Sequence, residues 1–314
     1  MIVARSAWQL RRAIDKAVND AVSGPIVDVA RERPRIAFIP TMGALHEGHI
    51  SLVRSAVADA NPITVASVFV NPTQFGDGED FSNYPRTEEA DLELLESAGL
   101  DVAFIPSVDD VYPEDFATEV KADRSLCECL CGASRGASHF DGVVTVVARL
   151  FGLVQPDTAW FGEKDWQQLQ IIRRMAADIY PGVEIMPSST VRAEDGLALS
   201  SRNAYLSEQA RSKASAVPQS VAAARKELLL SGDVAKALET GVSVLTESGF
   251  GVDYFELRSA QGLRPVVEFN PDSEDLPNHP RIFVAATLDG VRLIDNEAVS
   301  TEASTRSKMA LTSL

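Results

Sequence analysis

The chain has 314 residues, of which 45% are hydrophobic and 24% are charged, a composition typical of a globular protein long enough for two domains. Lys and Arg number 29 and Asp and Glu number 45, so the formal net charge is −16. An acidic surface of this kind repels phosphate backbones and anionic lipid, which disfavours nucleic acid and membranes as partners. An anionic substrate must then be bound by a local cluster of cationic side chains and backbone N–H groups.

No apolar run approaches the roughly 20 residues that a membrane-spanning helix needs. Residues 1–15 (MIVARSAWQLRRAID) carry charges through the region that would be apolar in a signal peptide. We therefore expect a cytoplasmic protein.

The first 190 residues alternate strand-like and helix-like patterns. Residues 35–40 (RIAFIP) are a short apolar run of the kind buried in parallel sheets, and Ile50, Val53 and Val57 follow at helical spacing. Further strands are expected at 63–70, 102–105, 158–161 and 183–186, and further helices at 88–98, 142–154 and 165–179. This alternation predicts an α/β domain over residues 1–190, with a Rossmann-like, doubly wound parallel sheet. Ligands of such sheets bind at the carboxyl ends of the strands.

After about residue 190 the pattern changes to that of a smaller α+β domain, residues 191–314. Ala-rich helices are expected at 207–230 and 234–248, and short strands at 252–258, 282–287 and 291–294. Residues 270–280 (NPDSEDLPNHP) are acidic and rich in proline, which predicts a mobile loop. The Ser/Thr-rich residues from about 300 predict a frayed end.

The cysteines Cys127, Cys129 and Cys131 lie together in the run CECLC. A structural zinc site needs four ligands at wider spacing, and His139 is the nearby candidate for a fourth. We expect reduced thiols in a cytosolic loop, with metal binding or redox switching as the alternative.

The most informative segment is residues 40–49 (PTMGALHEGH), between the first expected strand and a helix. Gly43 and Gly48 remove side chains where a backbone must approach a ligand closely. A helix that starts near His46 points N–H groups and the positive end of its dipole at this loop, which suits phosphate. His46 and His49 share one face of the first turn, where the dipole favours neutral imidazoles that can donate to phosphate oxygens. The alternative is a polar first turn with two incidental histidines.

This HxGH segment after the first strand resembles the signature of the nucleotidyltransferase superfamily, which includes class I aminoacyl-tRNA synthetases. The longer string PTMGALHEGH is similar to the pantothenate synthetase (pantoate–β-alanine ligase) family in particular. The resemblance extends to residues 68–76 (VFVNPTQFG), 84–87 (YPRT), 161–169 (FGEKDWQQL), 191–206 (VRAEDGLALSSRNAYL), 252–258 (VDYFELR) and 293–296 (LIDN). It covers about residues 5–297, and the combination of motifs is highly specific.

The segment GEKD supplies a candidate catalytic cation. Gly162 opens a helix N-terminus, and Lys164 is a compact, mobile charge that can neutralise phosphate as pyrophosphate leaves. A solvated surface lysine is the alternative. The resemblance assigns ATP contact to Gly162, Glu163, Lys164 and Asp165, with Lys164 as the main catalytic cation.

The segment LSSRN offers hydroxyl groups at Ser200 and Ser201 and a planar, phosphate-binding fork at Arg202. A plain helix cap is the alternative. The family uses this segment as its counterpart of the mobile phosphate loop of synthetases, and the backbone at Val191 matches the position that meets adenine. The resemblance thus implies the catalytic residues His46, His49, Lys164 and Arg202, and further ATP contacts from Met42, Gly43, Ala44, Leu45, Glu47, Gly48 and Leu199.

Neutral side chains are the candidates for the small substrates. Gln74 and Gln168 carry both donors and acceptors, so they can fix hydroxyls and a carboxylate without a change of charge. The resemblance implies that Gln74 contacts pantoate and β-alanine, that Gln168 holds pantoate, and that Asn71 contacts β-alanine. Met42 and Phe69 would form the apolar wall for the gem-dimethyl group of pantoate.

The resemblance also implies a homodimer, a smaller domain that closes over the ATP site, and Mg²⁺ with ATP, for which Asp91 is the candidate ligand. The chain departs from the family at Ala90, where a second acid is frequent, at Trp166, where Tyr is common, and at Leu199, where Met is common. The family's R-P-x-H-F appears as residues 135–140 (RGASHF), one residue longer, so Arg135 is not among the candidates.

The implied mechanism has two steps and no covalent enzyme intermediate. The carboxylate of pantoate attacks the α-phosphorus of Mg-ATP, giving pantoyl adenylate and pyrophosphate. The amine of β-alanine then attacks the activated carbonyl and releases AMP. The enzyme would act by alignment and by stabilising phosphate charge, because it supplies no nucleophile.

Three other functions remain as alternatives. A nucleotidyltransferase that attaches AMP or CMP to a phosphorylated substrate would need more cations for a second phosphate. A tRNA synthetase would need a basic RNA-binding surface. A non-catalytic nucleotide sensor is expected to lack Lys164, His46 or His49, and all three are present.

Overall fold

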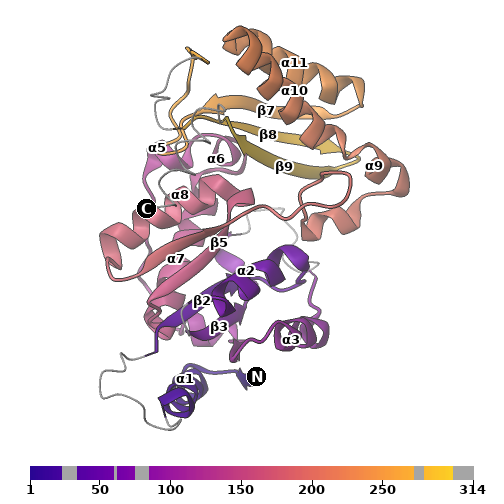
Figure 1. Ribbon diagram of the computed structural model, residues 1–314. Coiled ribbons are helices and arrows are strands. Elements are labelled where there is room, and N and C mark those ends of the chain that lie inside the picture. Colours follow the sequence, from indigo (N-terminus) through magenta and orange to yellow (C-terminus); the bar gives the residue numbers. More distant parts are fainter. Residues whose placement is uncertain (23–33, 60–61, 75–84, 272–278, 300–314) are drawn as a thin grey trace, which may run out of the picture. The chain divides into compact units, whose positions relative to one another are not determined.

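The computed structural model describes residues 1–22, 34–59, 62–74, 85–271 and 279–299 (Figure 1). The chain forms two compact units: unit 1 is Met1–Cys127, Arg135–Glu163 and Ile171–Val191, and unit 2 is Glu128–Ser134, Lys164–Gln170 and Arg192–Leu314. Two short segments from the first 190 residues therefore belong with the C-terminal part. Residues 272–278 of the expected acidic loop, and the expected frayed end from residue 300, lie outside the described residues.

Unit 1 is built on a sheet that, in the described part of the chain, has six strands, each parallel to its neighbours. The strand order is β1–β4–β3–β2–β5–β6, with β1 (Ile2–Ala4), β2 (Ile36–Thr41), β3 (Ile63–Val68), β4 (Val102–Phe104), β5 (Thr158–Gly162) and β6 (Glu184–Ser188). The order reverses between the neighbours β2 and β5, which places a ligand-binding crevice at their carboxyl ends. The predicted α/β class and doubly wound sheet are confirmed.

Helices cover both faces of this sheet. Side chains alternate between the faces along a strand. In β2, Ile39 packs in one buried cluster with Val53 of α2 (Glu47–Val57), whereas the ring of Phe38 meets Phe151 of α7 (Ala137–Val154) edge-on, 6.2 Å between centroids. The other helices that lie wholly or partly in unit 1 are α1 (Ala7–Val22), α3 (Glu88–Ser97), α4 (Val108–Val111), α5 (Arg124–Cys127), α6 (Cys131–Arg135) and α8 (Trp166–Ile179).

The predicted stripes of the helices are mostly buried. In α2, Ile50 and Val53 are in the core, but Val57 is 40% exposed and Ala56 is buried in its place. The α7 helix begins at Ala137 instead of residue 142, and its stripe of Val143, Val147, Leu150, Phe151 and Val154 is fully inside the unit. Among the described helices, α7 alone has the length and apolarity of a membrane span, and it is a largely buried core helix.

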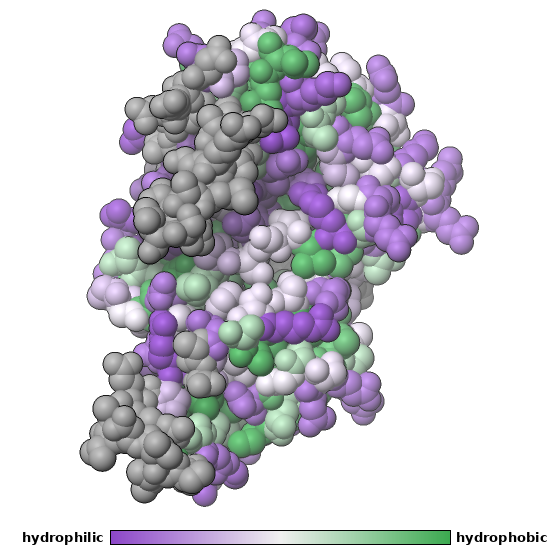
Figure 2. Space-filling model, viewed as in Figure 1, coloured by the Kyte–Doolittle hydropathy of each residue, from purple (hydrophilic) through white to green (hydrophobic). Residues whose placement is uncertain are grey.

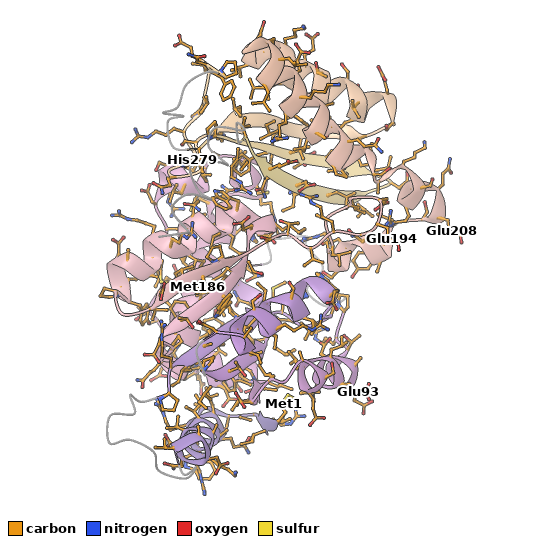
Figure 3. All side chains as sticks on the ribbon, viewed as in Figure 1. Met1, Glu93, Met186, Glu194, Glu208 and His279 are labelled. Carbon is orange, nitrogen blue, oxygen red and sulfur yellow. The ribbon has the colours of Figure 1, made fainter. Side chains whose placement is uncertain are left out.

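The α3 helix turns an acidic residue inward. Asp91 and Leu95 are its buried residues, and Glu93 points away from the unit (Figure 3). A carboxylate on the buried side of an amphipathic helix needs hydrogen-bond donors around it, and these turn out to lie in the loop after β2.

Unit 2 holds an antiparallel sheet in the order β7–β8–β9, formed by β7 (Gly251–Arg258), β8 (Arg281–Leu288) and β9 (Val291–Ala298). Two helices, α10 (Ala216–Ser231) and α11 (Val234–Glu247), lie together over one face of it (Figure 1). Val221 and Leu228 of α10 share a core with Val284 of β8. This antiparallel sheet confirms the smaller α+β part of the predicted fold class.

The helix predicted over 207–230 is interrupted, and α9 (Glu208–Lys213) precedes α10. Pro218 lies in the first turn of α10, where a proline ring is tolerated. A continuous helix would bring that ring against the carbonyl of Ala214, so the break at 214–215 relieves a clash. Figure 2 shows hydrophilic residues gathered over α9, in agreement with its mostly exposed side chains.

Candidate functional site

The loop after β2 makes a tight turn before α2. Gly43 has φ of +84° and Ala44 has φ of +49°, both in the left-handed region. Glycine enters this region freely, whereas an alanine there is strained by about 1–2 kcal/mol. The turn sets His46 as the N-cap of α2, at the carboxyl end of β2 and beside the point where the strand order reverses.

His46 and His49 are fixed by the first turn of α2. His46 Nδ1 accepts a hydrogen bond from the N–H of Gly48 at 3.1 Å, and His49 Nδ1 accepts one from the N–H of His46 at 3.3 Å. A ring nitrogen that accepts from an N–H carries no proton, so both imidazoles hold theirs on Nε2. The two rings lie 4.1 Å apart between centroids. Two neutral imidazoles beside a helix N-terminus form a donor set for phosphate oxygens.

The buried carboxylate of Asp91 anchors this turn. Its Oδ2 accepts from the N–H of Ala44 at 3.0 Å, and its Oδ1 accepts from the N–H of Leu45 at 2.8 Å and from Thr87 Oγ1 at 3.1 Å. Asp91 is only 2% exposed, and it gives most of its acceptor capacity to the protein. The structure therefore gives Asp91 another task than the magnesium ligation that the resemblance implied.

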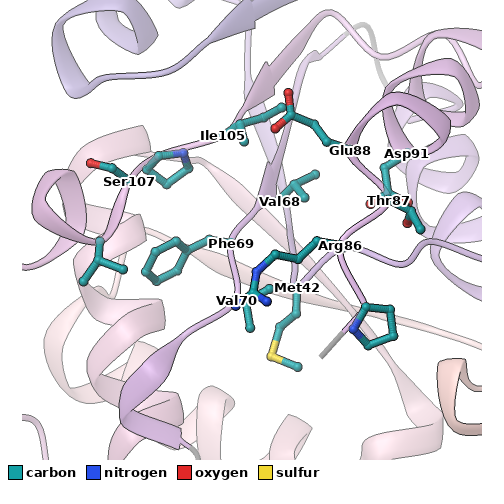
Figure 4. Close-up of a pocket in the computed structure, with 14 residues that line it drawn as sticks. Met42, Val68, Phe69, Val70, Arg86, Thr87, Glu88, Asp91, Ile105 and Ser107 are labelled. Carbon is teal, nitrogen blue, oxygen red and sulfur yellow. The ribbon is translucent and has the colours of Figure 1, made fainter. Parts of the chain in front are cut away.

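Met42 and Phe69 line a cavity of about 260 Å³ within unit 1 (Figure 4). Its walls come from the carboxyl ends of β2, β3 and β4 and from the start of α3, and most of the lining side chains are apolar. Sites for drug-sized ligands span roughly 300–1,000 Å³. A cavity below that range suits a small molecule and not a whole nucleotide.

Asn71 is the centre of a hydrogen-bonded cluster next to the 3₁₀ turn η1 (Pro72–Gln74). Its Nδ2 donates to Gln74 Oε1 and to the carbonyl of Gly142, each at 3.2 Å. Its Oδ1 accepts from the hydroxyls of Tyr112 at 2.9 Å and Thr73 at 3.0 Å. Because Asn71 is only 1% exposed and its amide is fully engaged, direct contact with a ligand would require one of these bonds to break.

Gln74 is held with its amide nitrogen towards Met42 Sδ. The cluster around Asn71 fixes the opposite end of the same amide through Gln74 Oε1. Gln74 is half-buried, so of these two candidates it is the one placed to meet a ligand.

Two residues of this cluster were not assigned to it from the sequence: Tyr112 was not considered, and His139 was considered only as a zinc ligand. Burial raises the pKa of Tyr112, so its hydroxyl remains a donor at neutral pH. His139 Nδ1 lies 2.8 Å from the carbonyl of Gln74 and donates to it, which leaves Nε2 to accept from Arg135 Nη1 at 3.0 Å. Arg135 is thus linked to Gln74 in spite of the extra residue in its motif. The spacing of four between Arg135 and His139 was the available signal.

In unit 2, Lys164 lies in the 3₁₀ turn η2 (Glu163–Asp165). Its side chain is only 16% exposed, and Nζ is 3.8 Å from Asp165 Oδ2. Its carbonyl accepts a hydrogen bond from Asn296 Nδ2 at 2.9 Å. Gln168 follows on α8 and is half-buried. This lysine is therefore not the solvated surface group that was its simpler interpretation.

Ser200 caps the 3₁₀ turn η3 (Ser201–Tyr205), because its Oγ accepts from the N–H of Arg202 at 3.3 Å. The simpler interpretation of this segment as a cap is thus correct for Ser200. The same cap fixes the backbone from which the exposed Arg202 side chain extends, so capping and phosphate binding are compatible here.

Residues 15–298 match the family model described as pantoate-beta-alanine ligase. The chain belongs to this family. A pantothenate synthetase of Chromohalobacter salexigens is 47% identical over 271 residues, which cover 86% of this chain and 93% of the relative. One of Rhodopseudomonas palustris is 43% identical over 299 residues, which cover 95% of this chain and 98% of the relative. The chain is accordingly a ligase of pantothenate biosynthesis.

Solved structures of the same family share the fold of this ligase. The pantothenate synthetase of Thermus thermophilus is 43% identical with a TM-score of 0.83, and the alignment covers 95% of this chain and 99% of the other. The pantoate–β-alanine ligase of Francisella tularensis, solved with "Beta-gamma ATP and Beta-alanine", is 30% identical with a TM-score of 0.71, over 97% and 100% of the two chains.

In this ligase, Cys129 and Cys131 of the CECLC run pack within unit 2. Cys131 Sγ lies 3.1 Å from the hydroxyl of Tyr254, and Gln167 bridges the N–H of Cys131 and the carbonyl of Cys129. Burial raises the pKa of the Cys129 thiol. Within the described ranges, no three His, Cys, Asp or Glu side chains gather into a metal-binding group. The contacts of the run are those of a packed structural segment.

Proposed function

We propose that the chain condenses pantoate with β-alanine to pantothenate by using ATP, through a pantoyl adenylate, with AMP and pyrophosphate as products. The observation that carries this proposal is the HxGH turn, in which two neutral imidazoles stand at the N-terminus of α2 beside the reversal point of the sheet. The structure of the Francisella relative, described as a complex with "Beta-gamma ATP and Beta-alanine", supports ATP and β-alanine as ligands of this chain.

In the first step, a carboxylate oxygen of pantoate forms a bond to the α-phosphorus of ATP as the bond to the β-phosphate oxygen breaks. The electron pair leaves with pyrophosphate. The Nε2–H groups of His46 and His49 donate to phosphate oxygens, and Lys164 neutralises the charge that grows on them. The remaining ATP contacts proposed are those implied by the family motifs, with Ser200, Ser201 and Arg202 on the phosphates and the backbone of Val191 on adenine.

Pantoate is proposed to lie against Met42 and Phe69, with its hydroxyl and carboxylate held by Gln74 and Gln168. Support comes from the shared cavity of about 260 Å³ that Met42 and Phe69 line. In the second step, the amine of β-alanine attacks the activated carbonyl carbon, the bond from that carbon to AMP breaks, and the amine loses a proton. Gln74 would orient the incoming amine, with Asn71 as its support.

Mg²⁺ is proposed to accompany ATP and to neutralise part of its phosphate charge. Asp91 does not fit the role of its ligand, because three hydrogen bonds from Ala44, Leu45 and Thr87 already engage the carboxylate. The metal would instead be held by the phosphate oxygens. A homodimer and a cytoplasmic location stay predictions.

The test is ATP–pyrophosphate exchange with pantoate and no β-alanine. We expect exchange that depends on pantoate, followed by release of AMP and pantothenate once β-alanine is added. Exchange that requires β-alanine would contradict an adenylate formed first. Transfer of the nucleotide into the final product, without AMP release, would favour the nucleotidyltransferase alternative.

A further inference from the structure

Two adjacent residues of β9, Asp295 and Asn296, lie in the segment 293–296 (LIDN), which has no task in the mechanism above. Each is only 3% exposed. Neighbouring residues on a strand direct their side chains to opposite faces of the sheet. One dipeptide can therefore hold two different segments of unit 2.

Asp295 holds the segment that follows Val191. Arg192 Nη1 and Nη2 donate to its two carboxylate oxygens at 2.6 Å and 2.9 Å, a two-point pair of the strong kind. The hydrogen bond that Arg192 donates to Asp295 raises the pKa of Arg192, so the guanidinium stays charged. Arg192 Nη1 also donates to the carbonyl of Gly196 at 3.0 Å, which ties the pair to the next turn of the chain.

That turn is a small hairpin whose backbone leads directly to the phosphate-binding candidates. Arg192 and Ala198 form an antiparallel bridge, and Glu194, labelled in Figure 3, lies in the turn between them. Asn203 Nδ2 then donates to the carbonyl of Ala198 at 3.1 Å, which joins the hairpin to η3. Through Arg192, Asp295 thus sets the position of the segment 200–202.

Asn296 holds the other phosphate-binding candidate of unit 2. Its Nδ2 donates to the carbonyl of Lys164 at 2.9 Å, and its Oδ1 accepts from Arg281 Nε at 2.8 Å. The Arg281 guanidinium stacks on the ring of Trp166, 3.7 Å from its centroid, and Trp166 Nε1 donates to the carbonyl of Ala260 at 2.8 Å. The segment 164–166 is therefore held at two points, the carbonyl of Lys164 and the side chain of Trp166.

We infer that Asp295 and Asn296 are positioning residues for adenylate formation, an inference that rests on the proposed function. Lys164 and Arg202 have long, mobile side chains, and a displacement of about 1 Å at a reacting centre costs up to about 10²-fold in rate. The two backbones that carry these cations are tied to one rigid strand. Ion pairs, whether exposed or buried, add little net stability over an apolar replacement, so the Arg192–Asp295 pair is better explained by geometry than by stability.

The experiment compares two variants, each of which weakens one of the two contacts: Asn296 with the carbonyl of Lys164, or Asp295 with Arg192. Asn296→Asp keeps the size of the side chain and the acceptor for Arg281, but it removes the donor to the carbonyl of Lys164. Arg192→Lys keeps the charge and loses the two-point geometry, at a side chain that is 31% exposed and therefore tolerant of change. The matched control is Asp253→Asn, which weakens another charged pair of the same unit, Arg292–Asp253, with an N–O distance of 2.6 Å.

Single-turnover formation of pantoyl adenylate should fall about 10- to 100-fold in both variants. The reaction of preformed pantoyl adenylate with β-alanine should keep the parent rate, and the control should keep both rates. Thermal unfolding checks that each variant is folded, and Arg192→Lys decides the matter if Asn296→Asp does not fold. Parent-rate adenylation, or an equal loss in both half-reactions, would overturn the inference. A parent enzyme that forms no pantoyl adenylate would instead refute the proposed function.

Discussion

Replacement of Asp91 with asparagine tests whether this carboxylate anchors the HxGH turn. Asparagine keeps the shape but has one acceptor oxygen, so its NH₂ group would face the N–H of either Ala44 or Leu45, now accepted at 3.0 Å and 2.8 Å. A hydrogen bond to a charged group is worth about 1.5–3 kcal/mol. The cost of a buried N–H without an acceptor is of similar size, and it describes the same broken bond, so the two figures are not added. We therefore expect the free energy that holds this turn in its conformation to fall by about 2–3 kcal/mol.

We expect the turn to change its conformation while the sheet stays folded, because Ala44 is already strained, with φ of +49°. If the loss falls on the turn that carries His46 and His49, adenylation slows by about 30- to 150-fold, since about 1.4 kcal/mol corresponds to a factor of ten. The assay is pantoate-dependent ATP–pyrophosphate exchange, measured over a range of Mg²⁺ concentrations.

The Mg²⁺ series separates the anchor from a metal ligand. An anchor predicts a lower maximal rate with the same dependence on Mg²⁺, whereas a ligand predicts that excess Mg²⁺ restores the rate. Glu93→Gln is the control, because Glu93 belongs to the same helix and is exposed. Recovery of the parent rate at high Mg²⁺, or an exchange rate in Asp91→Asn equal to that of Glu93→Gln, would refute the reasoning.

Gly142→Ala should weaken binding of both small substrates and lower the unfolding midpoint, because a Cβ would lie 2.4 Å from the carbonyl oxygen of Thr73 and force α7 away from the Asn71 cluster. Tyr112→Phe should raise the KM for β-alanine with little effect on ATP, since it removes a donor to Asn71 worth about 0.5–1.5 kcal/mol. Lys164→Ala should slow adenylation by roughly 10²–10³ with modest loss of ATP binding, because its charge acts mainly in the transition state.

For each of these three variants, one result would contradict the prediction. Parent values of KM and midpoint in Gly142→Ala would show that α7 and the neighbouring segment can part without effect. A change in the KM for ATP in Tyr112→Phe equal to that for β-alanine would place the hydroxyl outside the small-substrate site. Adenylation at the parent rate in Lys164→Ala would remove the lysine from the chemistry.

The buried strands of unit 1 were predictable from sequence because a short, continuous apolar run such as 63–68 is typical of a strand covered on both faces. The three-residue strand β1 (Ile2–Ala4) was missed, since a run that short has no measurable period. The helix α1 was also missed, because its buried residues Leu10, Ala13 and Ile14 form a narrow stripe among charged neighbours. The break before α10 was missed because residue composition favoured helix while the ring of Pro218 did not.

The residues of the candidate site also fall into two groups, those that the sequence could predict and those that it could not. Side chains that are expected to touch substrate carry their chemistry in their type and spacing, as His46 and His49 do, so a motif can point to them. Supporting residues act on backbone atoms far away in sequence: Asp91 on Leu45, and Asn296 on Lys164. A bond to a backbone N–H or carbonyl puts no constraint on the type of its partner, and so the pair leaves no pattern in a single sequence.

The choice of aspartate at position 91 looks unfavourable beside a loop proposed to bind phosphate in a chain with a net charge of −16. Its geometry resolves the conflict. A neutral asparagine could accept from only one of the two N–H groups of the turn, whereas the carboxylate accepts from both and from the hydroxyl of Thr87. Those three donors stabilise the charged carboxylate and so offset the cost of burying it in a residue that is only 2% exposed. The carboxylate holds the turn, while the histidines and the helix dipole supply the positive potential that the proposed phosphate would meet.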